Sequence, residues 1–271
     1  MTEKNETYSF RKRIVVFIDI LGFASHVTQA ASEDSADKAK QIDGAVLDIK
    51  RLGNSPNSET HIFSDSAIIS VKDDPSEIQD LFRNLTYLTW SLMIKGVFIR
   101  GGVSYGKVSK DKNKPWGPAI IEAYKIESSV ARYPRLALAR SALEFLRSKH
   151  LEEKLESISR DHDGVYSIDV IPTCFTQAKS DAIVANEIGI ATPTTADFCS
   201  IKNHLDKAYD SAVDVPRIFA KITWLCREWD LSAAKHHNEK GEDYRTKYFD
   251  DYTGKDVFDI GIGVLRSAPS S

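Results

Sequence analysis

Short apolar runs alternate with longer segments of helical spacing along the first part of the chain. The predicted elements are strands at about 14–20, 60–64, 67–72 and 97–105, and helices at about 24–52 and 76–94. Ser64-Asp65-Ser66 separates the second and third strands and indicates a hairpin tip. The order β-α-β-β-α-β is that of a ferredoxin-like α+β sandwich, in which helices pack on one face of an antiparallel sheet.

The second half of the chain continues with mixed elements. The pattern predicts helices at about 117–129, 141–158, 196–212 and 214–232, strands at about 136–138 and 165–171, and a charged, loosely held tail from about 238. We find no repeat, low-complexity segment or clear linker in the sequence. We therefore expect one domain over 1–271, with a core at about 14–172 and a C-terminal helical extension at about 173–271.

Composition narrows the class of protein. Apolar residues make up 42% of the chain, enough for a core, and the net charge of −3 gives no basic field for nucleic acid. The three cysteines are widely spaced, which indicates neither a zinc site nor a disulfide framework and fits a reducing cytosol. The polar first 13 residues do not resemble a signal peptide, and no apolar run approaches the roughly 20 residues that span a bilayer. We expect a cytoplasmic protein without a membrane partner.

Two carboxylates stand at the ends of predicted strands. Asp19 follows the apolar run 14–18, and Asp65 lies at the predicted hairpin tip. A lone Asp after a strand is usually a helix or turn cap. On neighbouring strands, however, the two carboxylates would converge and form a site for hard divalent cations.

Residues beside these acids favour phosphate binding. The backbone N–H groups of Leu21, Gly22 and Phe23 lie between a predicted strand and a predicted helix, whose N-terminus suits an anion. Arg100 begins the glycine-rich run 100–106 and can hold phosphate oxygens in a planar fork, or else pair with an acid on the surface. The glycines of this run can equally mark a β-bulge.

These motifs together resemble those of class III nucleotide cyclases. Residues 17–23 are similar to the first metal motif, and 63–66 to the second, where most relatives have Gly at the position of Ser64. Residues 100–106 resemble the strand whose arginine binds the triphosphate, and 116–127 the helix that carries the transition-state residues. The resemblance covers about 14–140.

Residues 124–127 and 132–135 favour one branch of that family, the Pycsar-type bacterial pyrimidine cyclases of antiphage defence. The resemblance implies that Asp19, Asp65 and the Ile20 carbonyl hold two Mg²⁺ or Mn²⁺ ions, and that the ribose 3′-oxygen attacks the α-phosphorus. It also implies a homodimer with composite active sites, and a separate effector protein that senses the cyclic product.

The chain departs from the purine cyclases at the positions that recognise the base and at those that stabilise the transition state. His61 and Lys114 stand where those enzymes have Lys and an acid, and Lys114 suits the carbonyl acceptors of uracil. His61 is otherwise a strand-edge histidine and Lys114 a solvated loop cation. Ile121 and Lys125 replace the usual Asn and Arg; Lys125 still supplies positive charge to the transition state, without a bidentate fork.

Arg132 and Arg135 are candidates to compensate for the missing arginine, but we favour structural ion pairs for both. The expected activity is a uridylate cyclase that makes 3′,5′-cyclic UMP and pyrophosphate from UTP. A cytidylate cyclase, a purine cyclase with unusual base contacts, and an inactive nucleotide-binding module remain as alternatives.

Overall fold

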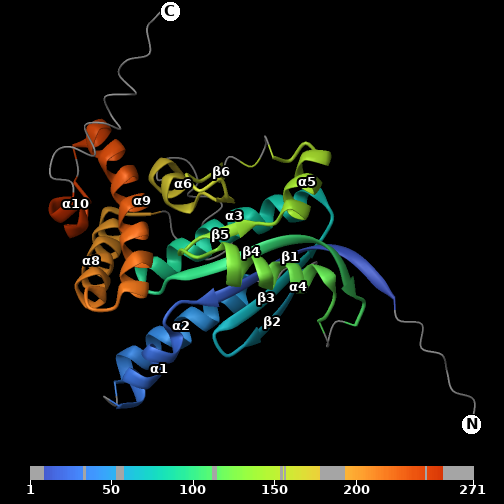
Figure 1. Cartoon of the computed structure of the whole chain (residues 1–271), viewed down its shortest axis with the longest axis horizontal. Coiled ribbons are helices and arrows are strands. Elements are labelled where there is room, and N and C mark those ends of the chain that lie inside the picture. The colour runs from blue at the N-terminus through green and yellow to red at the C-terminus, as the bar shows by residue number, and fades with distance from the viewer. Residues whose placement is uncertain are drawn as a thin grey trace, which may run out of the picture. The chain divides into compact units, whose positions relative to one another are not determined.

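The structure, a computed structural model, describes residues 9–32, 35–52, 58–111, 115–152, 155, 157–177, 193–241 and 243–252. These residues fall into two compact units, 1–192 and 193–271 (Figure 1). Lys114, predicted to read the base, lies outside the described residues. The single domain with a helical extension stays a prediction.

The first unit is built on a seven-stranded sheet with the order β2-β3-β1-β4-β5-β7-β6. The strands are β1 (Phe10–Ile20), β2 (Ser58–Phe63), β3 (Ser66–Lys72), β4 (Ile99–Ser109), β5 (Leu136–Leu138), β6 (Ile158–Arg160) and β7 (Tyr166–Ile168). Strands β4 and β5 pair in parallel, and the other pairs are antiparallel. The predicted α+β class, with an antiparallel βαββαβ core, is confirmed.

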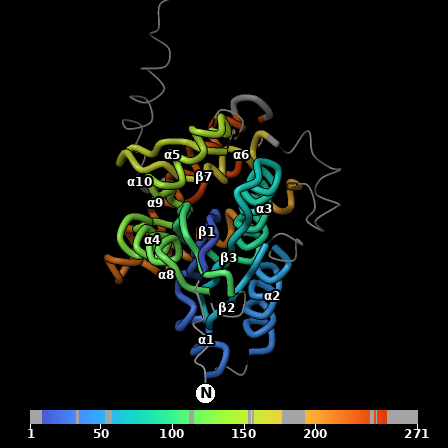
Figure 2. The backbone as a smooth tube through the Cα atoms, turned by 90° about the vertical axis from the view of Figure 1, so that its right-hand side faces the viewer, coloured from blue at the N-terminus to red at the C-terminus, as the bar shows by residue number. Residues whose placement is uncertain are grey.

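Helices cover both faces of this sheet. They are α1 (Phe23–Ser32), α2 (Ala36–Leu52), α3 (Pro75–Ile94), α4 (Pro118–Lys125), the π-helical turn η1 (Ile126–Val130), α5 (Arg140–Ser148) and α6 (Val170–Gln177). Figure 2 shows α2 and α3 on one side of β1 and β3, with α4 on the other. Strand β1 is therefore enclosed, and the side chains of Ile14, Val15 and Val16 are fully buried.

Three predicted elements have different bounds in the structure. The predicted helix at 24–52 is two helices, α1 and α2. The predicted helix at 141–158 ends at Ser148, because His150 adopts a positive φ of 53° that a right-handed helix does not allow. The predicted strand at 165–171 is the short β7, and α6 begins at Val170.

Helix α3 shows how local sequence sets an element boundary. The Asp74 carboxylate caps the helix by accepting hydrogen bonds from the N–H groups of Ser76 and Glu77, and Pro75 occupies the first turn, where its missing N–H costs nothing. The buried face of the helix includes Phe82 and Trp90.

Glycines in β4 allow a helix to pack directly on the strand. A Cβ atom at Gly102 would lie 2.1 Å from the carbonyl oxygen of Ala123 and 2.8 Å from the nitrogen of Glu127. A Cβ at Gly101 would lie 2.6 Å from the carbonyl oxygen of Phe17. The β1–β4 register runs without interruption from Phe10–Ser109 to Ile20–Ile99. The bulge considered for these glycines is therefore wrong, because their role is close backbone approach.

The described residues of the second unit form helices α8 (Thr195–Ala212), α9 (Pro216–Lys240) and α10 (Lys247–Tyr252). The predicted loose tail is wrong for 244–246, because Tyr244 and Thr246 are buried against α9. The Trp229 indole N–H donates to the Tyr244 carbonyl, and the Asp230 carboxylate accepts from the N–H and hydroxyl of Thr246. Burial raises the pKa of Asp230 to about 6. No helix among the described residues is long and apolar enough to cross a membrane.

The two glycines Gly102 and Gly44 give a matched test of this packing. We expect Gly102→Ala to lower the free energy of unfolding by about 3 kcal/mol, because helix α4 must move away from the strand. Gly44 lies within α2 with nothing within 4 Å of an added Cβ, so Gly44→Ala should raise stability by about 0.5–1 kcal/mol. Chemical denaturation measures both; a loss of stability no larger at Gly102 than at Gly44 would contradict the packing argument.

Candidate active site

The strand register brings the predicted site residues to one end of the sheet. Asp19 lies opposite Ser66 on β3 and opposite Arg100 on β4. The N–H of Ile20 donates to the carbonyl of Asp65 over 2.9 Å. The backbones of the two predicted metal-binding residues are therefore neighbours, as the resemblance requires.

Arg100 lies between two carboxylates. Its Nε atom is 3.1 Å from Oδ2 of Asp19 and 2.7 Å from Oε1 of Glu127. The Arg100 and Asp19 side chains are 21% and 18% exposed, whereas that of Glu127 is 3% exposed. Charges that are screened this little by solvent interact strongly. Arg100, predicted to hold phosphate, is held by two acids in this structure.

Glu127 is a member of this cluster to which sequence analysis assigned no role. It lies in η1, directly after α4. A signal was present in the sequence, because Glu127 follows the buried Ala119 and Ala123 at four-residue spacing. An acid in line with two small buried residues on a helix indicates a carboxylate that faces the sheet.

The turn after Asp19 begins helix α1. Gly22 has a φ of +73°, which favours glycine, and its carbonyl accepts a hydrogen bond from the N–H of His26. The N–H of Leu21 donates to the carbonyl of Phe98 over 2.9 Å. The expectation that this N–H faces a phosphate is therefore corrected, because it completes the pairing next to β4. Of the predicted phosphate donors, Gly22 and Phe23 remain.

The β2–β3 hairpin carries Asp65 in a two-residue loop. Phe63 pairs with Ser66, and Ser64 has a φ of +55°. That left-handed conformation costs a non-glycine residue about 1 kcal/mol. It gives a physical reason why glycine suits this position in the cyclases that the motif resembles.

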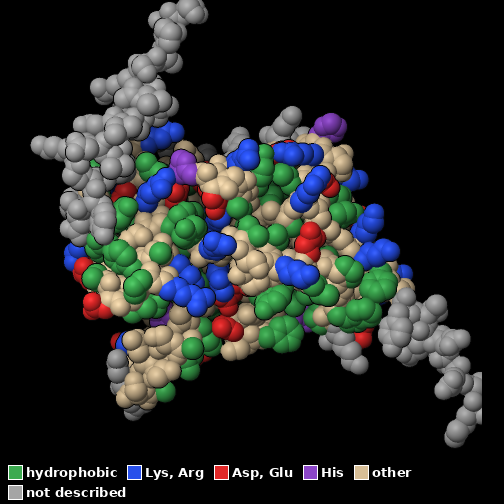
Figure 3. Space-filling model, viewed as in Figure 1, with side chains coloured by type: hydrophobic (Ala, Val, Ile, Leu, Met, Phe, Trp, Pro, Cys, Tyr) green, Lys and Arg blue, Asp and Glu red, His purple; other side chains and the backbone are tan. Residues whose placement is uncertain are grey.

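The remaining predicted residues lie on β2 and α4. His61 is half-buried and pairs with Ile68 of β3. Lys125 is exposed at the end of α4, and Ile121 and Tyr124 on the same helix are 54% and 52% exposed. Ile121 and Tyr124, together with Trp116, which is 44% exposed, form an apolar surface over α4, as Figure 3 shows.

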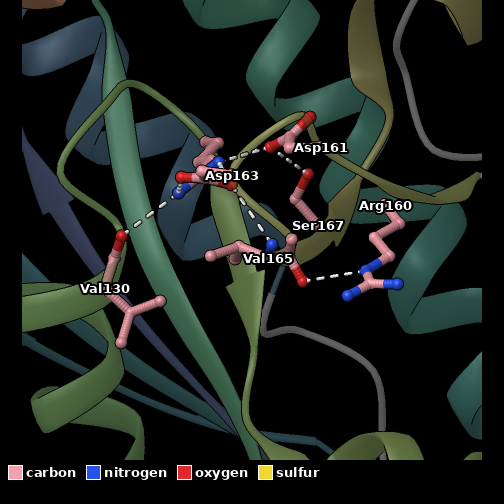
Figure 4. Close-up of polar contacts among 8 residues, drawn as sticks. Val130, Arg160, Asp161, Asp163, Val165 and Ser167 are labelled. Carbon is pink, nitrogen blue, oxygen red and sulfur yellow. Dashed lines mark hydrogen bonds and ion pairs between the residues drawn. The ribbon is translucent and has the colours of Figure 1, made fainter.

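Arg135 has a structural role. It is buried, and its guanidinium donates to the carboxylates of Asp161 and Asp163 and to the carbonyl of Val130. Figure 4 labels these three partners. Burial opposes its charge, but the hydrogen bonds to Asp163 and Asp161 outweigh this and raise the pKa of Arg135. The structural ion pair favoured for Arg135 is confirmed.

This Arg135 cluster also supports the two segments that hold the site. Val130 ends η1, which carries Glu127. The carbonyl of Arg135 accepts a hydrogen bond from the N–H of Gly101, next to Arg100. The cluster therefore connects the turn of Glu127 to the strand of Arg100.

The donor atoms at the end of the sheet fit a hard divalent cation. The backbones of Asp19 and Asp65 are neighbours, and their carboxylates are the kind of oxygen ligand that Mg²⁺ and Mn²⁺ prefer. Within the described ranges no group of three or more His, Cys, Asp or Glu side chains forms a ready metal site. Asp19 and Asp65 are therefore the candidate carboxylate ligands for a cation at this end of the sheet.

Comparison with protein-family models finds no match for the sequence, and comparison with curated protein sequences finds none. Solved structures with a similar fold include a bacterial light-regulated adenylyl cyclase (15% identity, TM-score 0.41). Others are a class III adenylyl cyclase-like ATP-binding protein and the adenylyl cyclase CyaB, both from Pseudomonas aeruginosa (15% and 12% identity, TM-score 0.42 for each).

The matched regions are partial. They cover 54%, 51% and 59% of this chain and 48%, 35% and 95% of the three others, in the same order. The chain thus spans about half and about a third of the first two proteins. At these identities and TM-scores the likeness concerns the fold and carries no argument about activity.

Arg135 and Arg132 give a matched test of the buried cluster. Arg135→Met should lower the free energy of unfolding by about 2 kcal/mol, because it leaves the carboxylates of Asp161 and Asp163 without their cation. The loss stays modest because the Asp163 side chain is 44% exposed and solvent screens its charge. Arg132 is exposed, and Arg132→Met should change stability by less than about 0.5 kcal/mol. Equal effects of the two substitutions in urea unfolding would show that the cluster adds no stability.

Proposed function

We propose that this chain is a nucleotide cyclase that converts UTP to 3′,5′-cyclic UMP and pyrophosphate. The observation that carries the proposal is the register at the end of the sheet, which sets Asp19 beside Arg100 and Ile20 beside Asp65. An acid pair next to an arginine is the combination that phosphoryl transfer uses, because the reaction needs positioning and charge neutralisation more than a protein nucleophile.

In this proposal Asp19, Asp65 and the Ile20 carbonyl hold two Mn²⁺ or Mg²⁺ ions. When bound, such ions lower the pKa of the ribose 3′-hydroxyl and neutralise charge on the departing pyrophosphate. Asp19 and Asp65 would orient the cations, and the N–H groups of Gly22 and Phe23 would donate hydrogen bonds to phosphate oxygens. Arg100 binds the triphosphate, where its planar fork matches two oxygens at once.

The bonds that change are few. The 3′-oxygen forms a bond to the α-phosphorus, the bond from that phosphorus to the bridging oxygen of pyrophosphate breaks, and the 3′-hydroxyl proton leaves to solvent. Attack and departure lie in line, so the substrate must be held at both its sugar and its triphosphate. Arg100 and the turn at Gly22 hold the triphosphate end.

A homodimer with composite sites would complete this arrangement. Support comes from the apolar side chains exposed on α4, which are costly to leave in water and suit a protein interface. Lys125 is exposed on the same helix and would then reach the site of a second copy. A C₂ dimer would hold two equivalent sites.

The base preference rests on His61 and Lys114, whose donors suit the carbonyl oxygens of uracil. By resemblance to the Pycsar branch, cyclic UMP would act as a second messenger in antiphage defence, sensed by a separate effector protein. Cytidylate cyclase is the alternative within the same chemistry.

A second candidate is a nucleotide-binding module without turnover. Ile121 has no group to hydrogen-bond the ribose, and Arg100 binds Asp19 rather than projecting freely. Retention of Asp19, Asp65 and Arg100 at one end of the sheet favours the enzyme.

Assay of the four nucleoside triphosphates with Mn²⁺ separates these readings. We expect pyrophosphate release with UTP, a slower rate with CTP, and a product whose mass is that of the cyclic monophosphate. Release with ATP or GTP alone would overturn the pyrimidine assignment. Binding of nucleotide without release would favour the inactive module.

The acid pair has its own test. Asp65→Ala should reduce turnover at least about 100-fold, since it removes a ligand to both cations, while the melting temperature stays close to that of the wild type. Asp80→Ala is the control, because Asp80 is an exposed acid that pairs with Arg83 on α3. Full activity of Asp65→Ala would remove the two-metal mechanism.

A further inference from the structure

Arg100 forms ion pairs with both Asp19, a proposed metal ligand, and Glu127, a buried acid. Its Nε–H donates a hydrogen bond to Oδ2 of Asp19 over 3.1 Å, and Oε1 of Glu127 forms an ion pair with the same nitrogen at 2.7 Å. A cation that binds Asp19 must compete with the guanidinium for the same carboxylate, because two positive charges on one carboxylate repel each other. Whether Arg100 stays paired with Asp19 therefore affects the affinity of Asp19 for a metal ion.

Glu127 is in a position to receive the arginine. It is 2% exposed, so it cannot exchange Arg100 for water without a large desolvation cost. Asp19 is more accessible, and a cation can replace the arginine there. Desolvation therefore favours keeping the ion pair between Arg100 and Glu127, whereas a cation can replace Arg100 at Asp19.

Backbone contacts also hold Glu127 next to Arg100. The nitrogen of Glu127 lies against Gly102, where a Cβ atom would come within 2.8 Å. At the other end of η1, Arg135 donates to the carbonyl of Val130. The carboxylate is thus carried on a turn held at both ends against the strand that bears Arg100.

We propose that Glu127 is a positioning residue that draws Arg100 away from Asp19 when a divalent cation binds, and so sets the cation affinity of Asp19. This inference rests on the proposed function, since it takes Asp19 as a metal ligand. Glu127 also keeps Arg100 within the site, beside the position of the triphosphate, instead of releasing the side chain to solvent.

Titration of the full chain with Mn²⁺ alone, by calorimetry and without nucleotide, tests the proposal. Glu127→Gln keeps the size of the side chain but removes its charge, so Arg100 pairs with Asp19 alone and Mn²⁺ affinity should fall about 10-fold. Arg100→Met should bind Mn²⁺ at least as tightly as the wild type. In the Arg100→Met background, Glu127→Gln should have little further effect, because its action passes through Arg100.

Controls separate positioning from loss of structure. Glu122→Gln makes the same charge change on the neighbouring helix, at an acid bonded to Ser141, and should leave Mn²⁺ affinity unchanged. Glu127→Asp keeps the charge but shortens the side chain, so its affinity should fall between those of the wild type and Glu127→Gln. Thermal unfolding of each variant identifies any that is misfolded, and Glu127→Asp then carries the test.

The outcomes distinguish this inference from the proposed function. Unchanged affinity in Glu127→Gln, or an equal loss with and without Arg100, overturns the positioning role even if the wild type makes cyclic UMP. The non-additive pattern in a chain that releases no pyrophosphate supports the positioning role and overturns the cyclase assignment.

Discussion

The close contact of helix α4 and turn η1 with strand β4 is the constraint on which the site depends. Gly102 permits it, because any side chain at that position would collide with the backbone at Ala123 and Glu127. The contact brings a buried acid on the helix to an arginine on the strand. Without it, Arg100 would pair with Asp19 alone, and the charge balance at the end of the sheet would differ.

The strand register is the second determinant of the site. Asp19 lies opposite Arg100 and Ser66, on the two neighbours of β1. Strand β1 is buried on both faces at Ile14, Val15 and Val16, which places it inside the sheet. Its pairing with β3 and β4 then sets which residues lie beside Asp19.

Carboxylates outnumber the guanidinium at this end of the sheet. Asp19 and Glu127 both lie against Arg100. In the function proposed above, divalent cations compensate the excess of negative charge and Arg100 binds phosphate oxygens. The Arg135 cluster serves a different purpose, since its guanidinium is enclosed by Asp161, Asp163 and a backbone carbonyl and holds segments in place.

The amino-acid sequence by itself determined the βαββαβ order and the positions of Asp19, Asp65 and Arg100 at strand ends, because hydrophobic periodicity is a local property of the chain. Only the tertiary structure decided the partners of Arg100, the role of Glu127, the division of the long first helix, and the Gly101–Gly102 contact with β1 and α4. Arg100 and Asp19 are 81 residues apart in the chain. Contacts at such separations depend on how strands pair and helices pack, which no local pattern of residues specifies.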